Sequence, residues 1–152
     1  MLRISKLTDY GTVILAHLAS QPERSLAAAE VAERTHIALP TVSKLLKTLQ
    51  RAGLVSSTRG SLGGYQLARP ASEITAAKIL DALEGPFAIT ECSGQHSNCG
   101  IESNCQVGHV WQRVNGAIRR ALNDVTLAQL AGIERGTSTT IPLTRISRVT
   151  HE

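Results

Sequence analysis

The sequence predicts a mainly α-helical fold that carries one small β-hairpin, and three observations support this prediction. Apolar residues recur every three or four positions in several segments of the 152-residue chain, as in amphipathic helices. One glycine-rich stretch, residues 58–64, separates two short runs of strand character. Aromatic residues make up only 3% of the chain, so aliphatic side chains must form the core, and an RRM or OB reader that stacks bases on aromatic rings is not expected.

Two helices are predicted in the first 35 residues. The first runs from Thr8 to Gln21 and Pro22, which end it. After a polar turn, residues 26–35 predict a short alanine-rich helix that ends near Thr35. The apolar positions that support these helices are Tyr10, Val13, Ile14 and Leu18 in the first, and some combination of Leu26, Ala29, Val31 and Ala32 in the second.

A third helix is predicted between Pro40, which suits a first helical position, and Gly53, which suits the position after a last turn. Val42, Leu45, Leu46 and Leu49 line one face of this helix, and Thr41, Ser43, Lys44 and Lys47 lie on the other. Hydroxyls and amines without acidic neighbours can contact base edges and phosphates in a major groove. A plain amphipathic helix is the alternative interpretation.

The stretch after this helix predicts a hairpin. Residues 54–57 and 65–68 read as two short strands, linked by TRGSLGG with Arg59 at the base. Helix, short helix, proline-started helix and hairpin in this order indicate a winged helix-turn-helix, in which Arg59 can reach phosphate or the minor groove. A nucleotide-binding glycine loop is the alternative, but no P-loop lysine and serine follow, and no helix opens after Gly64.

Two further helices are predicted beyond Pro70. Residues 76–84 lie between Thr75, a suitable N-cap, and Gly85, a suitable stop, and should pack on the winged domain through Ile79, Leu80 and Leu83. Residues 107–123 form a longer amphipathic helix, and Thr126 caps a short final one. The stripe of the long helix comprises Val110, Val114, Ala117, Ile118, Ala121 and Leu122, followed by Val125.

The long apolar stripe predicts a two-fold dimer, because one helix cannot cover such a stripe alone. We expect Val110, Val114, Ile118 and Ala121 to contact a second copy of the chain. Packing of part of the stripe on its own winged domain is an open alternative.

Charge is distributed unevenly along the chain. Residues 1–70 carry nine Lys and Arg against four Asp and Glu, a net charge of +5, whereas residues 71–152 carry seven against eight. The basic half is therefore the half to test for nucleic-acid binding, with a solvated basic surface as the alternative.

The compartment bears on the chemistry of the cysteines. An apolar run near the start contains His17 and follows Asp9; it is too short to span a membrane and lacks the layout of a signal peptide. We therefore expect a cytoplasmic protein without a membrane partner. In that reducing compartment, three thiols are more typical of metal binding or redox chemistry than of structural disulfides.

All three cysteines of the chain, Cys92, Cys99 and Cys105, lie in one segment with the spacing Cys-x6-Cys-x5-Cys. Structural zinc sites usually contain Cys-x2-Cys pairs, which are absent, whereas wide-set thiolates can hold an iron-sulfur cluster. Zinc and free or redox-active thiols remain open. Candidates for a fourth ligand are His96, His109, Glu91, Glu102, or a residue of another segment or subunit, Asp9 included. No cysteine-histidine-carboxylate arrangement of an enzyme is evident.

The opening LRISKLTDYG, the run GLVSSTRGSLGGYQLARP and three cysteines ahead of a helix with Trp111 resemble the IscR and NsrR family of winged-helix transcription regulators. The resemblance covers residues 1 to about 131, and its hairpin motif is highly specific. It implies a homodimer with one DNA-reading domain per subunit, a long dimerisation helix, and a two-iron or four-iron cluster on the cysteines that senses cluster supply, oxidants or nitric oxide. Within the family, the chain most resembles regulators of the SUF cluster-assembly operon.

The resemblance also implies roles for single residues. Cys92, Cys99 and Cys105 match the cluster cysteines, and Arg59 matches the basic wing residue. The position of the IscR-type histidine ligand is Gly108 here, and His109 is displaced by one. Asp9 matches an aspartate that completes a four-iron cluster from the partner subunit in the nitric-oxide-sensing branch, so it ranks above His109. Ser43 replaces a base-discriminating glutamate of the IscR branch, which predicts a different operator.

These patterns predict four parts: a winged helix-turn-helix domain at 1–85, a cysteine-rich cluster-binding loop at 86–106, a dimerisation helix region at 107–131 and a mobile tail at 132–152. The resulting hypothesis is a homodimeric repressor that binds a palindromic operator and controls iron-sulfur assembly genes according to the state of its cluster. The alternatives are a nitric-oxide-sensing repressor of the same family and a zinc-stabilised winged-helix module without a sensing role.

Overall fold

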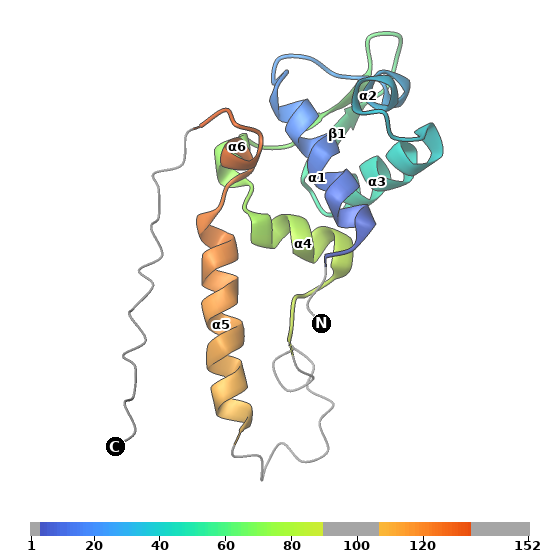
Figure 1. Cartoon of the computed structure of the whole chain (residues 1–152). Coiled ribbons are helices and arrows are strands. Elements are labelled where there is room, and N and C mark those ends of the chain that lie inside the picture. The colour runs from blue at the N-terminus through green and yellow to red at the C-terminus, as the bar shows by residue number, and fades with distance from the viewer. Residues whose placement is uncertain (1–3, 90–106, 135–152) are drawn as a thin grey trace, which may run out of the picture.

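Helices make up most of the computed structural model, which describes residues 4–89 and 107–134 (Figure 1). The described elements in chain order are α1 (Lys6–Ala19), α2 (Ala28–Thr35), α3 (Leu39–Arg51), β1 (Val55–Thr58), β2 (Gly64–Leu67), the 3-10 helix η1 (Ala71–Glu73), α4 (Ala76–Glu84), α5 (Gly108–Asp124) and α6 (Leu127–Leu130). The predicted class, mainly α with one β-hairpin wing, is confirmed.

Capping residues set the ends of the helices. The Ser5 hydroxyl accepts a hydrogen bond from the Thr8 amide, so α1 begins at Lys6, two residues before the predicted start. Helix α3 begins at Leu39, one residue before the predicted start, so Pro40 lies at the second position of its first turn rather than at the first. Thr75 caps α4 by accepting from the Lys78 amide, as predicted. The short helix η1 is not evident from the sequence pattern.

The core lies between α1, α2, α3, the hairpin, α4 and α6. The largest fully buried side chains are Ile14, Leu15, Leu18, Leu26, Val31, Val42, Leu46, Leu49, Ile74, Ile79 and Leu127. Val13, an apolar position of the first predicted helix, is exposed, whereas Ile14 beside it is buried. Among the apolar positions of the second, Leu26 and Val31 are buried and Ala29 is exposed.

The hairpin is attached to the helices at its second strand. β1 and β2 pair antiparallel, from Val55 opposite Leu67 to Thr58 opposite Gly64. Tyr65 also exchanges two backbone hydrogen bonds with Leu26, of 2.8 and 2.9 Å, just before α2. A Cβ atom at Gly64 would lie 2.6 Å from the Leu26 carbonyl oxygen, so this close contact requires glycine.

Helix α5 projects away from the winged domain, whereas α6 returns to it beside α1 (Figure 1). The Leu127 amide donates to the Ile74 carbonyl over 2.7 Å, and the Ala76 amide donates to the Val125 carbonyl over 2.8 Å. The Leu127 side chain is fully buried, so the carboxyl end of α5 is fixed to the core.

Within the two described ranges, none of the helices has the length and apolar character that a membrane-spanning segment needs. The predicted tail at 132–152 lies outside the described residues from position 135 onward.

Candidate nucleic-acid interface

Helix α3 presents a basic face to solvent. Lys44 and Lys47 are exposed, and neither side chain has an ion pair or hydrogen bond among the described residues. Thr41 and Ser43 are half-buried at the two margins of this face. Exposed amines flanked by hydroxyls can contact phosphates and base edges together.

Arg51 belongs to the same face, although it was not among the residues predicted to contact DNA. Positions 44, 47 and 51 follow one another at a spacing of three and four residues, so the three cations share one side of α3. Arg51 is also exposed. The spacing of Arg51 from Lys44 and Lys47 could therefore have identified it as part of the basic face from the sequence alone.

The hairpin is held against α3 by a polar contact that the sequence pattern did not suggest. The Gln50 side-chain amide donates to the Ser57 hydroxyl over 2.8 Å, which links the last turn of α3 to β1. Arg59 follows β1 directly, is exposed, and has no partner among the described residues. The two elements predicted to contact DNA therefore have a defined relative position.

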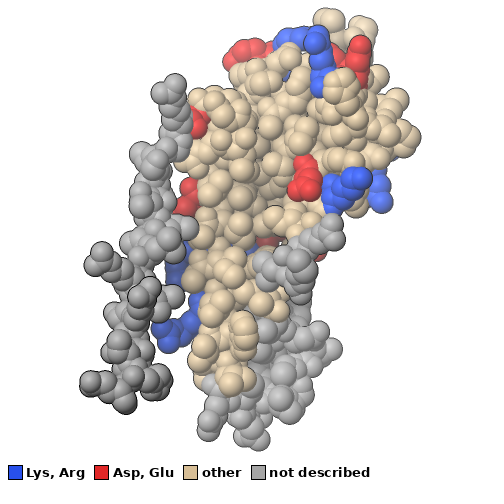
Figure 2. Space-filling model, viewed as in Figure 1, with Lys and Arg blue, Asp and Glu red and all other residues tan. Residues whose placement is uncertain are grey.

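Figure 2 shows Lys and Arg at the upper edge, at the right-hand edge and beside α5. A broad, mostly uncharged area lies between them, and an acidic group interrupts it to the right of centre. The basic side chains of this view therefore lie at its edges.

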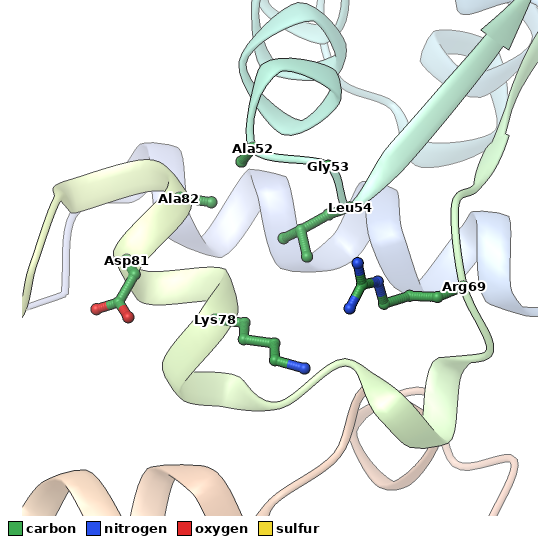
Figure 3. A pocket seen from close by; sticks show the side chains of 7 residues that line it. All are labelled: Ala52, Gly53, Leu54, Arg69, Lys78, Asp81 and Ala82. Atoms are coloured by element: carbon green, nitrogen blue, oxygen red, sulfur yellow. The ribbon is translucent and has the colours of Figure 1, made fainter.

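A second basic site lies at the carboxyl end of α3. Arg69 and Lys78 point into a common space beside Leu54, while Asp81 points away from them (Figure 3). The pocket has a volume of about 350 Å³, and the Lys78 ammonium donates to the Glu73 carbonyl at 2.8 Å. Because Thr41 and Ser43 lie in the amino-terminal turns of α3, this pocket is separate from the predicted reading residues.

Asp81 connects α4 to α5 through a bidentate ion pair. The Arg119 guanidinium donates to both carboxylate oxygens, over 3.0 and 2.5 Å. This hydrogen bonding is the main reason that the pKa of Asp81 lies below its ordinary value of 3.8. Partial burial opposes the shift, and the Phe87 amide and the charge of Arg119 add to it. The Ile89 amide donates to the Asn115 side chain over 3.3 Å, which places the last described residue before the cysteine segment against α5.

Helix α5 contacts its own domain through Asn115 and Arg119, and the part of its apolar stripe nearest its amino terminus stays exposed. Asn115 is buried, whereas Val110 is 56% exposed and Val114 is 37% exposed. Helical geometry places both valines roughly opposite Arg119. Of the other predicted dimer contacts, Ala121 is exposed and Ile118 is half-buried. Farther along the stripe, Leu122 and Val125 are half-buried and line a groove with α1 and α4. Part of the stripe therefore packs on its own winged domain, and the dimer contacts stay a prediction.

The cysteine segment itself, with Cys92, Cys99, Cys105, His96, Glu91 and Glu102, lies outside the described residues. Two candidate ligands are described, and both are exposed: Asp9 on α1 and His109 in the first turn of α5. Within residues 4–89 and 107–134, no three His, Cys, Asp or Glu side chains are grouped closely enough to hold a metal ion.

Asp9 lies at an otherwise mainly apolar groove of about 490 Å³. The groove is lined by Ile4, Thr8, Asp9, Thr12, Val13, Ala76, Ile79, Leu80, Leu122, Val125 and Leu130. Leu122 is 13 residues beyond His109 on the same helix, a rise of roughly 20 Å. Asp9 and His109 of one subunit therefore lie near opposite ends of α5.

Comparison with known proteins extends these observations. Residues 4–132 match the model of the Rrf2 family, whose description is "Iron-dependent Transcriptional regulator". Protein rrf2 of Nitratidesulfovibrio vulgaris is 32% identical over 130 residues, which make up 85% of this chain and 87% of the relative.

Solved structures agree with the sequence comparison. CymR (YrzC), the global cysteine regulator of B. subtilis, superposes with a TM-score of 0.68 at 30% identity, covering 88% of this chain and 99% of that chain. T. potens IscR gives a TM-score of 0.65 at 30% identity, covering 88% and 90%. The family match over residues 4–132 spans the winged domain as well as α5 and α6.

Proposed function

This chain belongs to the Rrf2 family of transcription regulators, and from that membership we propose that it is a homodimeric repressor that senses iron-sulfur cluster status and controls cluster-assembly genes. At the level of the family, it is a DNA-binding regulator and not an enzyme. We propose, beyond the family level, that the chain forms a homodimer, that its signal is the state of an iron-sulfur cluster, and that its operator controls cluster-assembly genes.

One observation carries the sensing part of the proposal: all three cysteines fall between two segments that are anchored to each other. Ile89, shortly before Cys92, is hydrogen-bonded to Asn115 of α5, and Val107, two residues after Cys105, directly precedes α5. A group bound between them can therefore act on the junction of α4 and α5. Such an effector changes DNA affinity only if it binds the two protein states differently.

The donor set fits an iron-sulfur cluster by its chemistry, since thiolates are the usual ligands of these clusters. Cys92, Cys99 and Cys105 would supply three ligands. Asp9 of the partner subunit is the preferred fourth, because its carboxylate is exposed and has no partner among the described residues. A bound cluster would supply a redox-sensitive group whose loss frees the three thiolates.

The dimer follows from the exposed stripe of α5. Val110 and Val114 have too little contact within their own subunit to be covered, and the groove around Asp9 offers further apolar surface. A second copy covers both in a two-fold arrangement. Two α3 helices then read successive major grooves, about one helical turn apart on a palindromic operator.

The sensing proposal is tested by absorption spectra and by iron, sulfide and zinc analysis of protein purified without oxygen. We expect a coloured wild type that contains acid-labile sulfide, and a colourless Cys92→Ala variant. Ser93→Ala, at the neighbouring position, should keep the colour. Loss or alteration of the spectrum in Asp9→Ala would support this residue as a ligand.

A colourless wild type that remains colourless after cluster reconstitution and contains stoichiometric zinc would contradict the proposal and favour the zinc-stabilised module. For a coloured protein, parallel exposure to oxygen and to nitric oxide identifies the signal that releases DNA. Repression is then measured as transcription from an operator that the wild type selects from a random DNA library.

A further inference from the structure

Leu62 is the most exposed large hydrophobic residue among the described positions. Its exposed fraction is 93%, and no other such residue exceeds 62%. It lies at the tip of the wing, three residues beyond Arg59, in a chain that binds DNA. Single exposed leucines are common on protein surfaces, so exposure alone does not indicate a role for Leu62. Its position on the wing and the geometry of the turn are the relevant observations.

The backbone holds Leu62 in a defined outward position. The Gly63 amide donates to the Gly60 carbonyl over 3.0 Å, which closes a turn with Ser61 and Leu62 at its centre. Gly60 has φ +113°, and a Cβ atom at Gly63 would lie 2.2 Å from the Thr58 carbonyl oxygen. Glycines on both sides therefore permit a tight tip on which the one large side chain points to solvent.

The wing tip also has a defined position relative to α3. The Gln50–Ser57 hydrogen bond joins β1, near its tip end, to the helix that carries Lys44 and Lys47. When α3 occupies a major groove, a hairpin extending from its carboxyl end meets the flanking phosphate strand and the minor groove beyond it. Arg59, which directly follows β1, suits the phosphates, and Leu62, farther out, would meet the groove.

We propose that Leu62 packs into the minor groove beside each half-site and selects against G·C pairs there. The inference rests on the proposed DNA reading and adds a specificity-determining residue to it. A·T pairs present only acceptors in the minor groove, whereas a G·C pair adds the guanine 2-amino donor. A leucine side chain lying over that donor leaves it without a hydrogen-bond partner, whereas it can pack on the sugars and on the adenine edge.

The test uses the full-length chain and a duplex that the wild type selects from a random library. At the flanking position, A·T is replaced by G·C or by inosine·cytosine, which has the major-groove edge of G·C but lacks the 2-amino group. We expect the wild type to lose affinity on the order of tenfold on the G·C duplex and little on the inosine duplex. The Leu62→Ser variant should bind the three duplexes equally, and Leu62→Met should restore the preference.

Two controls separate this role from general effects. Ile133→Ser removes another exposed apolar side chain, outside the wing, and should leave the base preference intact. Thermal unfolding of Leu62→Ser should match that of the wild type, because the side chain has little contact with the fold.

The outcomes distinguish the inference from the function on which it rests. If the wild type selects no duplex, the DNA-reading proposal fails and the inference fails with it. If it selects a duplex but discriminates equally with and without Leu62, or treats inosine as it treats guanine, the minor-groove inference alone is wrong. Unchanged DNA binding with lost repression in Leu62→Ser would likewise overturn it and point to a protein partner at the wing tip.

Discussion

Single residues of the wing motif have separate physical tasks. Gly64 lets β2 pass close to the backbone of Leu26, and Gly63 lets the tip fold over Thr58. The tyrosine that follows, Tyr65, pairs with Leu26. The glycines of the motif thus serve the attachment of the wing, while Arg59 and Leu62 stay free to contact a ligand.

Replacement of Gly64 by alanine should destabilise the protein. The added Cβ atom would lie 2.6 Å from a backbone oxygen that cannot move independently, and we expect a loss of about 1–3 kcal/mol in the free energy of unfolding. Urea unfolding followed by circular dichroism measures this loss.

Gly116→Ala is the matched control, because the added Cβ atom would lie 3.5 Å from the flexible end of the Arg120 side chain. In mid-helix, this change should be neutral or stabilising by up to about 1 kcal/mol. Equal effects of the two substitutions would contradict the close contact between β2 and Leu26.

The Asp81–Arg119 ion pair should make stability depend on pH. Because Arg119 lowers the folded-state pKa of Asp81, the pair stabilises above the ordinary value of 3.8, and this contribution is lost as pH falls through the lower folded value. The Arg119 side chain is 40% exposed, so we expect only about 0.5–1 kcal/mol. The unfolding free energies of wild type and Asp81→Asn should differ at pH 7 and converge near the acid limit of folding.

Arg119→Ala should have the same effect at pH 7, whereas Arg120→Ala, at the next position, should have less. A pH-independent difference between wild type and Asp81→Asn would show that the carboxylate does not stabilise the helix through its charge.

At the scale of elements, the helices were predictable because their ends are encoded locally. Pro40, Thr75 and Gly85 lie at the expected ends, and the apolar spacing of α3 identified its buried face. The inward face of α5 was not predictable in the same way. An apolar stripe indicates that a helix face packs against another surface, but it does not indicate whether that surface belongs to the same subunit. In α5, the polar residues Asn115 and Arg119 make hydrogen bonds to the rest of the subunit.

The return of α6 to the core was also missing from the sequence interpretation. Its contacts are backbone hydrogen bonds to Ile74 and the burial of Leu127, and neither has a local sequence signature. Most of the candidate DNA-binding face was predictable, because helical spacing alone brings Lys44 and Lys47 together. The cysteine ligands, outside the described residues, stay predictions.

A charge on the α5 stripe should dissociate the proposed dimer. Val114→Asp places a carboxylate on the exposed apolar face, where a second copy would have to bury it. Sedimentation velocity should change from the mass of two chains to that of one, 16.2 kDa. Ser72→Asp, an exposed change on η1, should stay dimeric. A wild type that sediments as a monomer at micromolar concentration would exclude this interface.

At the scale of the whole molecule, operator affinity should depend more on where the Lys and Arg side chains lie than on the total positive charge. Removing Lys44 and Lys47 together deletes two expected phosphate contacts, so operator affinity should fall and its dependence on salt should flatten by about two in log–log slope. Binding isotherms at several salt concentrations measure both quantities.

The pair Arg69 and Lys78 provides a control of equal charge, because these cations line the pocket at the other end of α3 (Figure 3). Their joint replacement by alanine should change the salt slope little. If both double variants weaken binding alike, α3 does not read DNA through its outer face, and the orientation proposed for the domain is wrong.

The two faces of α5 also bear on how related regulators could coexist in one cell. Arg119, which binds α5 to its own domain, lies roughly opposite Val110 and Val114, which we propose contact the second subunit. After gene duplication, the stripe could therefore diverge while folding is maintained. Two paralogues could in this way become insulated from each other, each assembling only with its own copies, without any change in the surfaces that recognise their operators.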